Sequence, residues 1–146
     1  MRLWHKDLIP ILPNKQLIDQ WRECCLIAKN IKEKGTPNHI LVNKVMNYPL
    51  IHFISYAGIV YDEMVNRGYN VTQKSYFTIA NLEKVDKDCL NSYPLSKEQI
   101  FPDWHNDHYF IQCYYNLQEK YECGGIPEEE WKRIGELFEI KLFNNI

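Results

Sequence analysis

The sequence predicts an all-α protein, a single compact helical domain of about four to five helices with long irregular connections. Apolar residues recur at three- and four-residue steps through several long segments, which is the spacing of a helix with one buried face. Glycine and proline stand where these helices are expected to begin or end. The length of 146 residues fits one domain with its own core, so residues 1–146 are expected to fold as one unit.

The first third of the chain is predicted to hold one long helix. Residues 1–12 are apolar and contain Pro10, which favours a short turn or a strand-like lead-in. Residues 13–34 carry one apolar stripe at helical spacing, and Gly35 is placed to end that helix. After a loop, a short helix is expected over residues 39–46.

The middle of the chain contains the most apolar helical segment. Residues 49–67 begin with a proline and are apolar around nearly the whole circumference up to Val60. They are therefore predicted to form the central helix of the core. Residues 69–104 are mixed in character, and residues 76–79 favour a short strand or an extended loop.

Two further helices are predicted near the C-terminus. One is expected over residues 105–121, broken by Gly124 and Gly125. Pro127 is followed by three glutamates, which is typical of a helix start because acidic side chains are favoured at the positive end of the helix dipole. A short amphipathic helix is expected there, and residues 141–146 are expected to pack down or fray.

Composition indicates an ordinary globular protein, with 45% hydrophobic and 25% charged residues. No apolar run approaches the roughly 20 residues that a membrane helix needs, and the first residues lack the layout of a signal peptide. The five cysteines are odd in number and include no CxxC, so most are expected to be buried, reduced thiols. A cytoplasmic protein without membrane contact is the expectation.

The net charge of -2 is not that of a strong general nucleic-acid binder. The charges are unevenly spread, however. Residues 1–75 hold 10 Lys/Arg and 6 Asp/Glu, a net of +4, and residues 76–146 hold 7 Lys/Arg and 13 Asp/Glu, a net of -6. This asymmetry could steer a phosphate ligand to one face, or it could be a chance distribution of solvated charges.

The first long helix carries the most informative polar side. Gln16, Gln20 and Glu23 share one face by their spacing, and Arg22 stands beside them. The ordinary interpretation is a solvated helix surface. The alternative is a functional site.

Several segments carry a more specific pattern. They are MRLWH at residues 1–5, RECC at 22–25, HILVNKV at 39–45, EMVNRGYNV at 63–71, and WHND at 104–107 followed by Tyr109. These segments resemble the pyrimidine-dimer DNA glycosylase (endonuclease V-type) family, and they look closest to its short members that begin with MRLWH and carry RECC. The resemblance is clear over about the first half of the chain and in the later patch.

The resemblance implies a helical DNA repair glycosylase with abasic-site lyase activity. Such enzymes cut the glycosidic bond of a damaged pyrimidine, as in a pyrimidine dimer, and then nick the strand. The α-amine of the first residue forms a Schiff base with the sugar carbon. An Arg-Glu pair on the first helix supplies the carboxylate that acts as acid and base. The matching positions here are Arg22 and Glu23. Since the large Arg2 side chain blocks removal of the initiator, the amine is that of Met1.

Elementary chemistry agrees with these roles. An α-amine has a pKa of about 7.7 to 8.0, so part of it is neutral and nucleophilic near pH 7. A nearby carboxylate such as Glu23 can move protons, and Arg22 can hold a phosphate or orient that carboxylate. The expected partner is double-stranded DNA with a damaged pyrimidine or an abasic site, bound by a monomer without a cofactor. The candidate DNA contacts are Arg2, His5, Lys6, Gln16 and Lys44.

Two other hypotheses stay open. The first is a catalytically inactive DNA-binding module of the same fold, which the retained Met1 and the missing aromatic-basic tail of the family favour. The second is a metal-dependent hydrolase built from His5, His105, Asp107 and His108, because imidazole and carboxylate groups are common metal ligands. Two histidines at i, i+3 without a longer motif are a weak signal, and they also fit capping or surface roles.

Overall fold

The first long helix has ends that the local sequence determines. α1 (Asn14–Lys34) follows Pro13, and its buried apolar side chains repeat at three- and four-residue steps. Gly35 ends it at φ 75°, and the Gly35 N–H donates to the Ile31 carbonyl at 2.9 Å. Glycine has no Cβ to clash in this left-handed conformation, so the predicted helix over residues 13–34 is confirmed with its stop signal.

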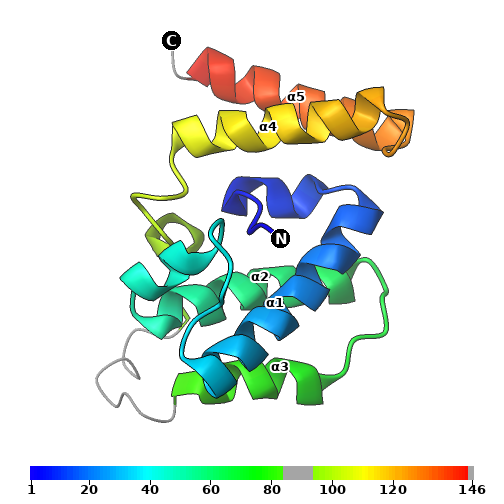
Figure 1. The fold of residues 1–146 in the computed structure, drawn as a ribbon. Coiled ribbons are helices and arrows are strands. Elements are labelled where there is room, and N and C mark those ends of the chain that lie inside the picture. The colour runs from blue at the N-terminus through cyan, green and yellow to red at the C-terminus, as the bar shows by residue number, and fades with distance from the viewer. Residues whose placement is uncertain (84–93, 145–146) are drawn as a thin grey trace.

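The fold is that of a computed structural model, which describes residues 1–83 and 94–144, without the side chains of residues 83 and 142–144 (Figure 1). Within these ranges the other α-helices are α2 (Leu50–Asn66), α3 (Gln73–Ala80), α4 (Asp107–Glu122) and α5 (Glu128–Asn144). Short 3-10 helices are η1 (Lys6–Ile11), η2 (Asn43–Asn47), η3 (Asn81–Glu83) and η5 (Lys97–Gln99). The described residues contain no β-strand, so the all-α prediction is confirmed.

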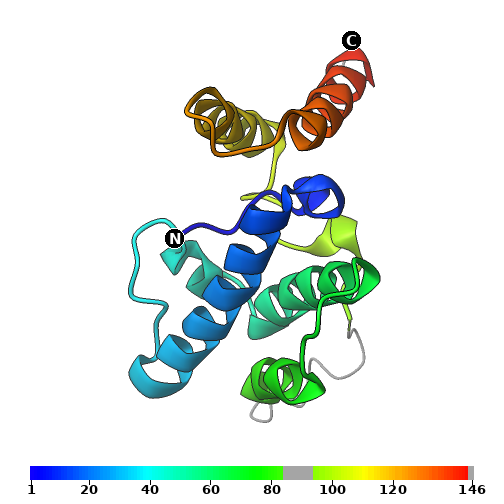
Figure 2. The ribbon, with the colours of Figure 1, turned by 90° about the vertical axis from the view of Figure 1, so that its right-hand side faces the viewer.

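The helices form two groups with the N-terminal segment between them. α1, α2 and α3 pack against one another, and α4 and α5 form an antiparallel pair. Figures 1 and 2 show the N-terminal segment running between the two groups, where η1 contacts α2 and α5. Leu3, Leu8 and Ile9 are fully buried there. From Leu3 onward the N-terminal segment therefore lies in the protein core, next to α1.

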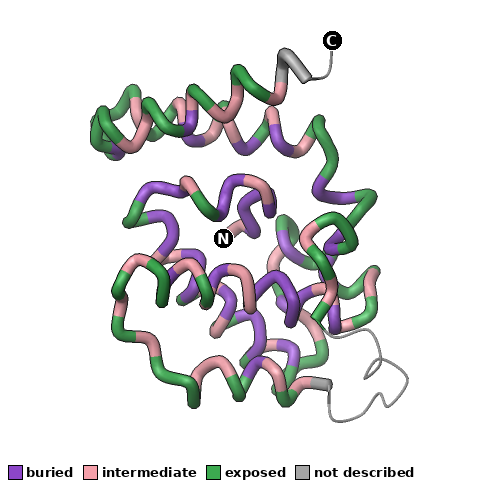
Figure 3. Tube along the Cα trace, turned by 180° about the vertical axis from the view of Figure 1, so that it is seen from behind, coloured by how far each residue is buried: buried purple, intermediate pink, exposed green. Residues whose placement is uncertain are grey.

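α2 is the central helix, as its apolar sequence predicts. It contacts α1, α3, η1 and η2, and its Phe53, Ile54 and Tyr56 side chains are completely buried. Figure 3 shows buried positions gathered along α2 and the N-terminal segment, whereas α5 is largely exposed or half-buried. A helix that is apolar on almost every side gains most by lying in the middle of the core.

The expectation for residues 76–79 is wrong, because they lie inside α3 rather than in a strand or extended loop. The Thr72 hydroxyl caps this helix by accepting from the Ser75 N–H at 3.3 Å. Ile79 is buried where α3 contacts α1 and α2. Aromatic and β-branched residues favour strands only weakly, and the cap together with burial of one helix face outweighs that preference.

Two shorter segments also differ from expectation. Of the short turn or strand-like lead-in that was expected, residues 6–11 form neither a strand nor a simple turn but the 3-10 helix η1. It is capped by the His5 side chain, which accepts from the Asp7 N–H at 3.1 Å. The helix expected over residues 39–46 is replaced by a turn followed by η2. In that turn the His39 N–H donates to the Asn43 side chain at 3.0 Å. A side-chain oxygen thus accepts the hydrogen bond that a backbone carbonyl would accept in a helix.

The C-terminal helices follow the predicted signals with shifted ends. Asn106 caps α4 by accepting from the Tyr109 N–H at 2.9 Å, so α4 starts two positions later than predicted. α5 starts at Glu128 as predicted, but it is a long helix that continues through most of the expected tail. Tyr114 on α4 stacks on Phe138 of α5 with ring centroids 3.9 Å apart. Residues 145–146 lie outside the described residues.

The expectation that most cysteines are buried, reduced thiols is met only in part. Cys24, Cys25, Cys113 and Cys123 are free, and the first and third are buried. Cys25 is half-buried, Cys123 is exposed, and Cys89 lies outside the described residues. Across the described helices, none combines the length and apolar character needed to cross a bilayer.

Candidate active site at the N-terminus

The backbone of the first residues is held by side chains from α1. The Trp4 N–H donates to Gln20 Oε1 at 2.7 Å, and Gln20 Nε2 donates to the Arg2 carbonyl at 2.9 Å. Gln20 is completely buried. One amide side chain therefore satisfies a donor and an acceptor of the N-terminal segment, as buried backbone groups require.

Two tyrosines hold the same segment from other helices. The Tyr56 hydroxyl on α2 donates to the Trp4 carbonyl at 2.5 Å and lies 3.1 Å from Gln20 Oε1. The Tyr109 hydroxyl on α4 donates to the Leu3 carbonyl at 2.6 Å. Contacts from α1, α2 and α4 thus determine where the first residues lie.

Glu23 lies directly beside the start of the chain. Its Oε2 accepts from the Arg2 N–H at 3.2 Å and from Gln20 Nε2 at 3.4 Å. The α-amine of Met1 is separated from that Arg2 nitrogen only by the Met1 Cα and carbonyl carbon, and Met1 packs half-buried against the core. Two of the predicted catalytic residues, Met1 and Glu23, are therefore neighbours in the fold.

Arg22 takes a different position from its neighbour Glu23. Its side chain is 76% exposed, and its guanidinium lies 3.8 Å from Asp19 Oδ1 on the same helix. The groups that orient the Glu23 carboxylate are the Arg2 N–H and Gln20 instead. Arg22 therefore does not orient Glu23 in this structure, and its guanidinium faces the solvent.

A cavity of about 380 Å³ opens beside Arg2. This Arg2 cavity is lined by side chains from the N-terminus, the 40–44 segment, the chain just before α4, and α4 itself. They are Arg2, Ile40, Leu41, Lys44, Trp104, Tyr109, Gln112, Tyr115 and Asn116. Both charged residues in its lining, Arg2 and Lys44, are cationic. The Arg2 guanidinium also lies 5.4 Å from the centre of the Trp4 ring, a cation–π distance. Cations and aromatic rings thus meet at Arg2, the residue whose backbone N–H contacts Glu23.

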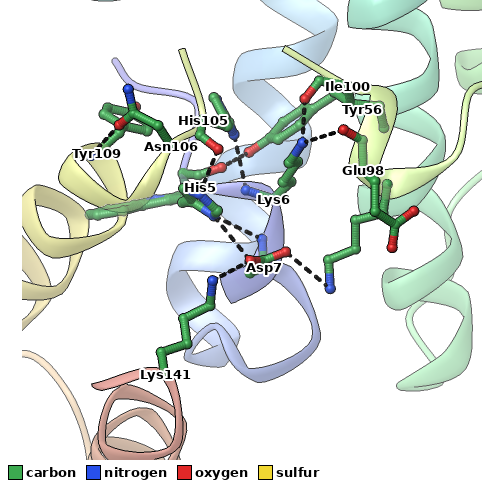
Figure 4. A network of polar contacts seen from close by, with 12 residues as sticks. His5, Lys6, Asp7, Tyr56, Glu98, Ile100, His105, Asn106, Tyr109 and Lys141 are labelled. Atoms are coloured by element: carbon green, nitrogen blue, oxygen red, sulfur yellow. Dashed lines mark hydrogen bonds and ion pairs between the residues drawn. The ribbon is translucent and has the colours of Figure 1, made fainter. Parts of the chain in front are cut away.

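Three of the predicted DNA contacts are buried instead of facing solvent. His5 is 2%, Lys6 is 6% and Gln16 is 7% exposed. The Lys6 ammonium donates to the carbonyls of Ile100 at 2.6 Å and Glu98 at 3.3 Å (Figure 4). These residues support the N-terminal segment from within, so a phosphate would reach them only if the core opened. The polar side of α1 is accordingly covered by the chain's own start rather than solvated.

His5 and His105 form a neutral buried pair within this support (Figure 4). Their rings stack with centroids 5.2 Å apart. His5 Nδ1 accepts from the Asp7 N–H at 3.1 Å, so its Nε2 donates to the His105 carbonyl at 3.0 Å. His105 Nδ1 accepts from the Lys6 N–H at 3.0 Å. Burial lowers the pKa of His5 to about 4 and that of His105 to about 2.

Asp7 ties this region to the C-terminal helix. Its carboxylate lies 2.5 Å from Lys141 Nζ on α5 and 3.4 Å from Lys97 Nζ (Figure 4). Burial works to raise the pKa of Asp7, but the hydrogen bond from Lys141 and the surrounding cations hold it below its usual value. The N-terminal segment is thereby held between α5 and η5.

The four residues of the hydrolase hypothesis do not converge as metal ligands. His105 Nδ1 and both ring nitrogens of His5 are engaged with backbone groups, and His108 is exposed on α4. Within residues 1–83 and 94–144, no group of three or more His, Cys, Asp and Glu side chains is placed to hold a metal ion.

Gln20, Tyr56 and Tyr109 hold the N-terminal segment but were not among the predicted catalytic residues or DNA contacts. Gln20 does share the polar side of α1 with Glu23, so its spacing could have marked it once that side was known to face the N-terminus. The two tyrosines come from helices far along the chain. Tyr109 follows the WHND segment that carries the family resemblance, whereas no local pattern distinguishes Tyr56 from an ordinary core tyrosine.

Replacing Gln20 by Leu should lower the free energy of unfolding by about 1–3 kcal/mol, because it leaves the buried Trp4 N–H without an acceptor. Urea denaturation measures this change. Gln73→Leu is the matched control, since Gln73 is exposed at the start of α3 and its replacement should change stability by less than about 0.5 kcal/mol. Equal stabilities of the two variants would contradict the role assigned to Gln20.

A family model resembles this chain over its N-terminal half. A family model described as pyrimidine dimer DNA glycosylase matches residues 1–77, which is more than half of the chain. Neither a curated protein nor a solved structure gives a match. The matched region holds Met1, Arg22 and Glu23 together with the cationic residues of the Arg2 cavity. The chain therefore belongs to the pyrimidine dimer DNA glycosylase family.

Proposed function

We propose that this protein is a DNA repair glycosylase and abasic-site lyase that acts on damaged pyrimidines, such as pyrimidine dimers, through the α-amine of Met1. The observation that carries the proposal is the hydrogen bond from the Arg2 N–H to Glu23 Oε2 at 3.2 Å. It places a carboxylate next to the first residue of the chain. Membership of the family supports the glycosylase reaction.

The proposed reaction uses the amine as a nucleophile and the carboxylate as a proton carrier. The neutral Met1 nitrogen attacks C1′ of the sugar as the glycosidic bond breaks, and the departing base takes up a proton. Loss of a proton from nitrogen and opening of the sugar ring give a Schiff base at C1′. Glu23 then removes a proton from C2′, and the C3′–O bond breaks to release the phosphate. Water finally hydrolyses the Schiff base and restores the amine.

The DNA is proposed to lie over the N-terminal face with one nucleotide drawn from the stack. A sugar carbon inside a duplex is out of reach of Met1, so the damaged base or its partner must leave the helix. The Arg2 cavity offers Trp104, Tyr109 and Tyr115 for stacking and Arg2 and Lys44 for phosphate. Exposed Arg22 lies on the neighbouring α1 surface for a further phosphate. We propose that the protein acts as a monomer and without a cofactor.

The test is borohydride trapping on a duplex with one abasic site. Untagged protein, its free Met1 verified by mass spectrometry, should give a covalent adduct that survives EDTA and maps to Met1. Protein acetylated at the α-amine should give none, because acetylation removes the nucleophile. Mapping also separates Met1 from Lys6, whose buried amine has a pKa lowered by burial.

Two outcomes would contradict the proposal. An adduct at a lysine would assign the chemistry to another amine. Absence of any adduct from protein with a verified free N-terminus would remove the Schiff-base mechanism. If such protein still bound damaged duplex DNA, the inactive DNA-binding module would become the better hypothesis.

A further inference from the structure

Two neighbouring aliphatic side chains project from the turn before η2. Ile40 is 84% exposed and Leu41 is 48% exposed. The next residue, Val42, is completely buried and anchors the turn in the core. Exposed apolar residues are common one at a time, but an adjacent pair at the rim of a cationic cavity is a feature that a binding partner can use.

The turn is held firmly enough to present these side chains in one place. Asn38 takes the left-handed conformation at φ 60°, and the Leu41 N–H donates to His39 Nδ1 at 3.2 Å. The Val42 and Asn43 N–H groups both donate to the His39 carbonyl, at 3.0 and 2.9 Å. A preorganised apolar projection loses little conformational freedom when it is buried by a partner.

The position of the pair identifies the chemistry of that partner. Ile40 and Leu41 line the Arg2 cavity, in which both charged side chains, Arg2 and Lys44, are cationic. Aromatic rings of Trp104 and Tyr109 form part of the same lining. Cations suit phosphates, rings suit unstacked bases, and an aliphatic pair suits the gap between base pairs. Duplex DNA presents all three groups together.

We infer that Ile40 and Leu41 form a wedge that enters the base stack of duplex DNA beside the lesion and fills the space left by the nucleotide drawn into the Arg2 cavity. This inference rests on the proposed function and adds the means by which the duplex is opened. Unstacking a base step costs free energy, and an apolar side chain inserted between the bases offsets part of that cost. The wedge and the cavity act on adjoining nucleotides, because Ile40 and Leu41 are themselves part of the cavity lining.

A binding experiment without chemistry tests the wedge. The probe is a duplex with a tetrahydrofuran abasic analogue, which cannot form a Schiff base, next to 2-aminopurine, whose fluorescence rises when it is unstacked. Wild-type protein should raise the fluorescence at saturation. The double variant Ile40→Ser/Leu41→Ser should lose most of that rise. The matched control is Val65→Ser/Ile140→Ser, since both residues are at least half exposed and neither lines the Arg2 cavity.

A second measurement separates this inference from the proposed function. Abasic-site cleavage by the wedge variant should fall by about 10-fold or more on a fully paired duplex, yet stay near wild type on single-stranded DNA, where nothing has to be unstacked. A wild-type fluorescence rise that the wedge variant retains would overturn the inference and leave the lyase proposal standing. Binding without any rise, or no binding, would also overturn it. A change of oligomeric state in the wedge variant with unchanged fluorescence would instead make the pair a contact between copies of the chain.

Discussion

Replacing Glu23 by Gln is expected to slow strand cleavage at an abasic site by about 10²–10⁴-fold, the usual contribution of a positioned acid or base. The amide oxygen can still accept from the Arg2 N–H, so the N-terminal segment should keep its place. What the variant loses is the ability to take up a proton. Single-turnover cleavage measures the chemical step, and DNA affinity should change little.

Asp19→Asn is the matched control, because Asp19 is a carboxylate on the same helix that contacts Arg22 rather than the N-terminus. Its cleavage rate should remain within a few-fold of wild type. Borohydride trapping of Glu23→Gln should also be weaker. A Glu23→Gln protein that cleaves as fast as Asp19→Asn would rule out Glu23 as the proton carrier.

Acid is expected to destabilise the protein through His5 and His105 well above the pH at which carboxylates titrate. In the folded protein their pKa values lie at about 4 and about 2, compared with about 6.5 in an unfolded chain. Below pH 6.5 the unfolded state binds protons that the folded state does not, so stability falls with falling pH. Well below pH 6.5 each histidine should cost about 1.4 kcal/mol of stability per pH unit. Between pH 6 and 5, where the unfolded histidines are still partly neutral, the pair should cost about 2.4 kcal/mol.

Urea denaturation across this pH range tests the effect. His5→Asn and His105→Asn keep an acceptor at the position of Nδ1, and each should reduce the slope of stability against pH by about one proton. His108→Asn should leave the slope unchanged, since His108 is exposed on α4. If all three variants kept the wild-type slope, the acid sensitivity would come from other groups. Protonation of Asp7 lowers the stability further only at lower pH, because the pKa of Asp7 lies below the usual range for a carboxyl.

Local sequence was sufficient to predict those helices whose ends and buried face depend on residues that lie close together in the chain. The stripe of α1 and its stop at Gly35, the apolar character of α2, and the start of α5 after Pro127 were all predicted correctly. The family was also predicted correctly, because its motifs are contiguous segments of the sequence such as MRLWH and RECC. The prediction for residues 76–79 failed because their preference for a strand is weak. The helix cap at Thr72 and the burial of Ile79 outweighed it.

The tertiary structure decided which polar side chains face the solvent. From periodicity alone, the side of α1 with Gln16, Gln20 and Glu23 could be a solvated surface or a site, because spacing does not show what covers a helix. In the fold the chain's own start covers it, with partners as far away as Tyr109, and His5 and Lys6 become interior supports. The Arg2 cavity likewise joins residues 2, 40–44 and 104–116. Sequence by itself determined the long helices and the family, because both depend on neighbouring residues. Contacts between distant segments determined which polar side chains are buried and which face the solvent.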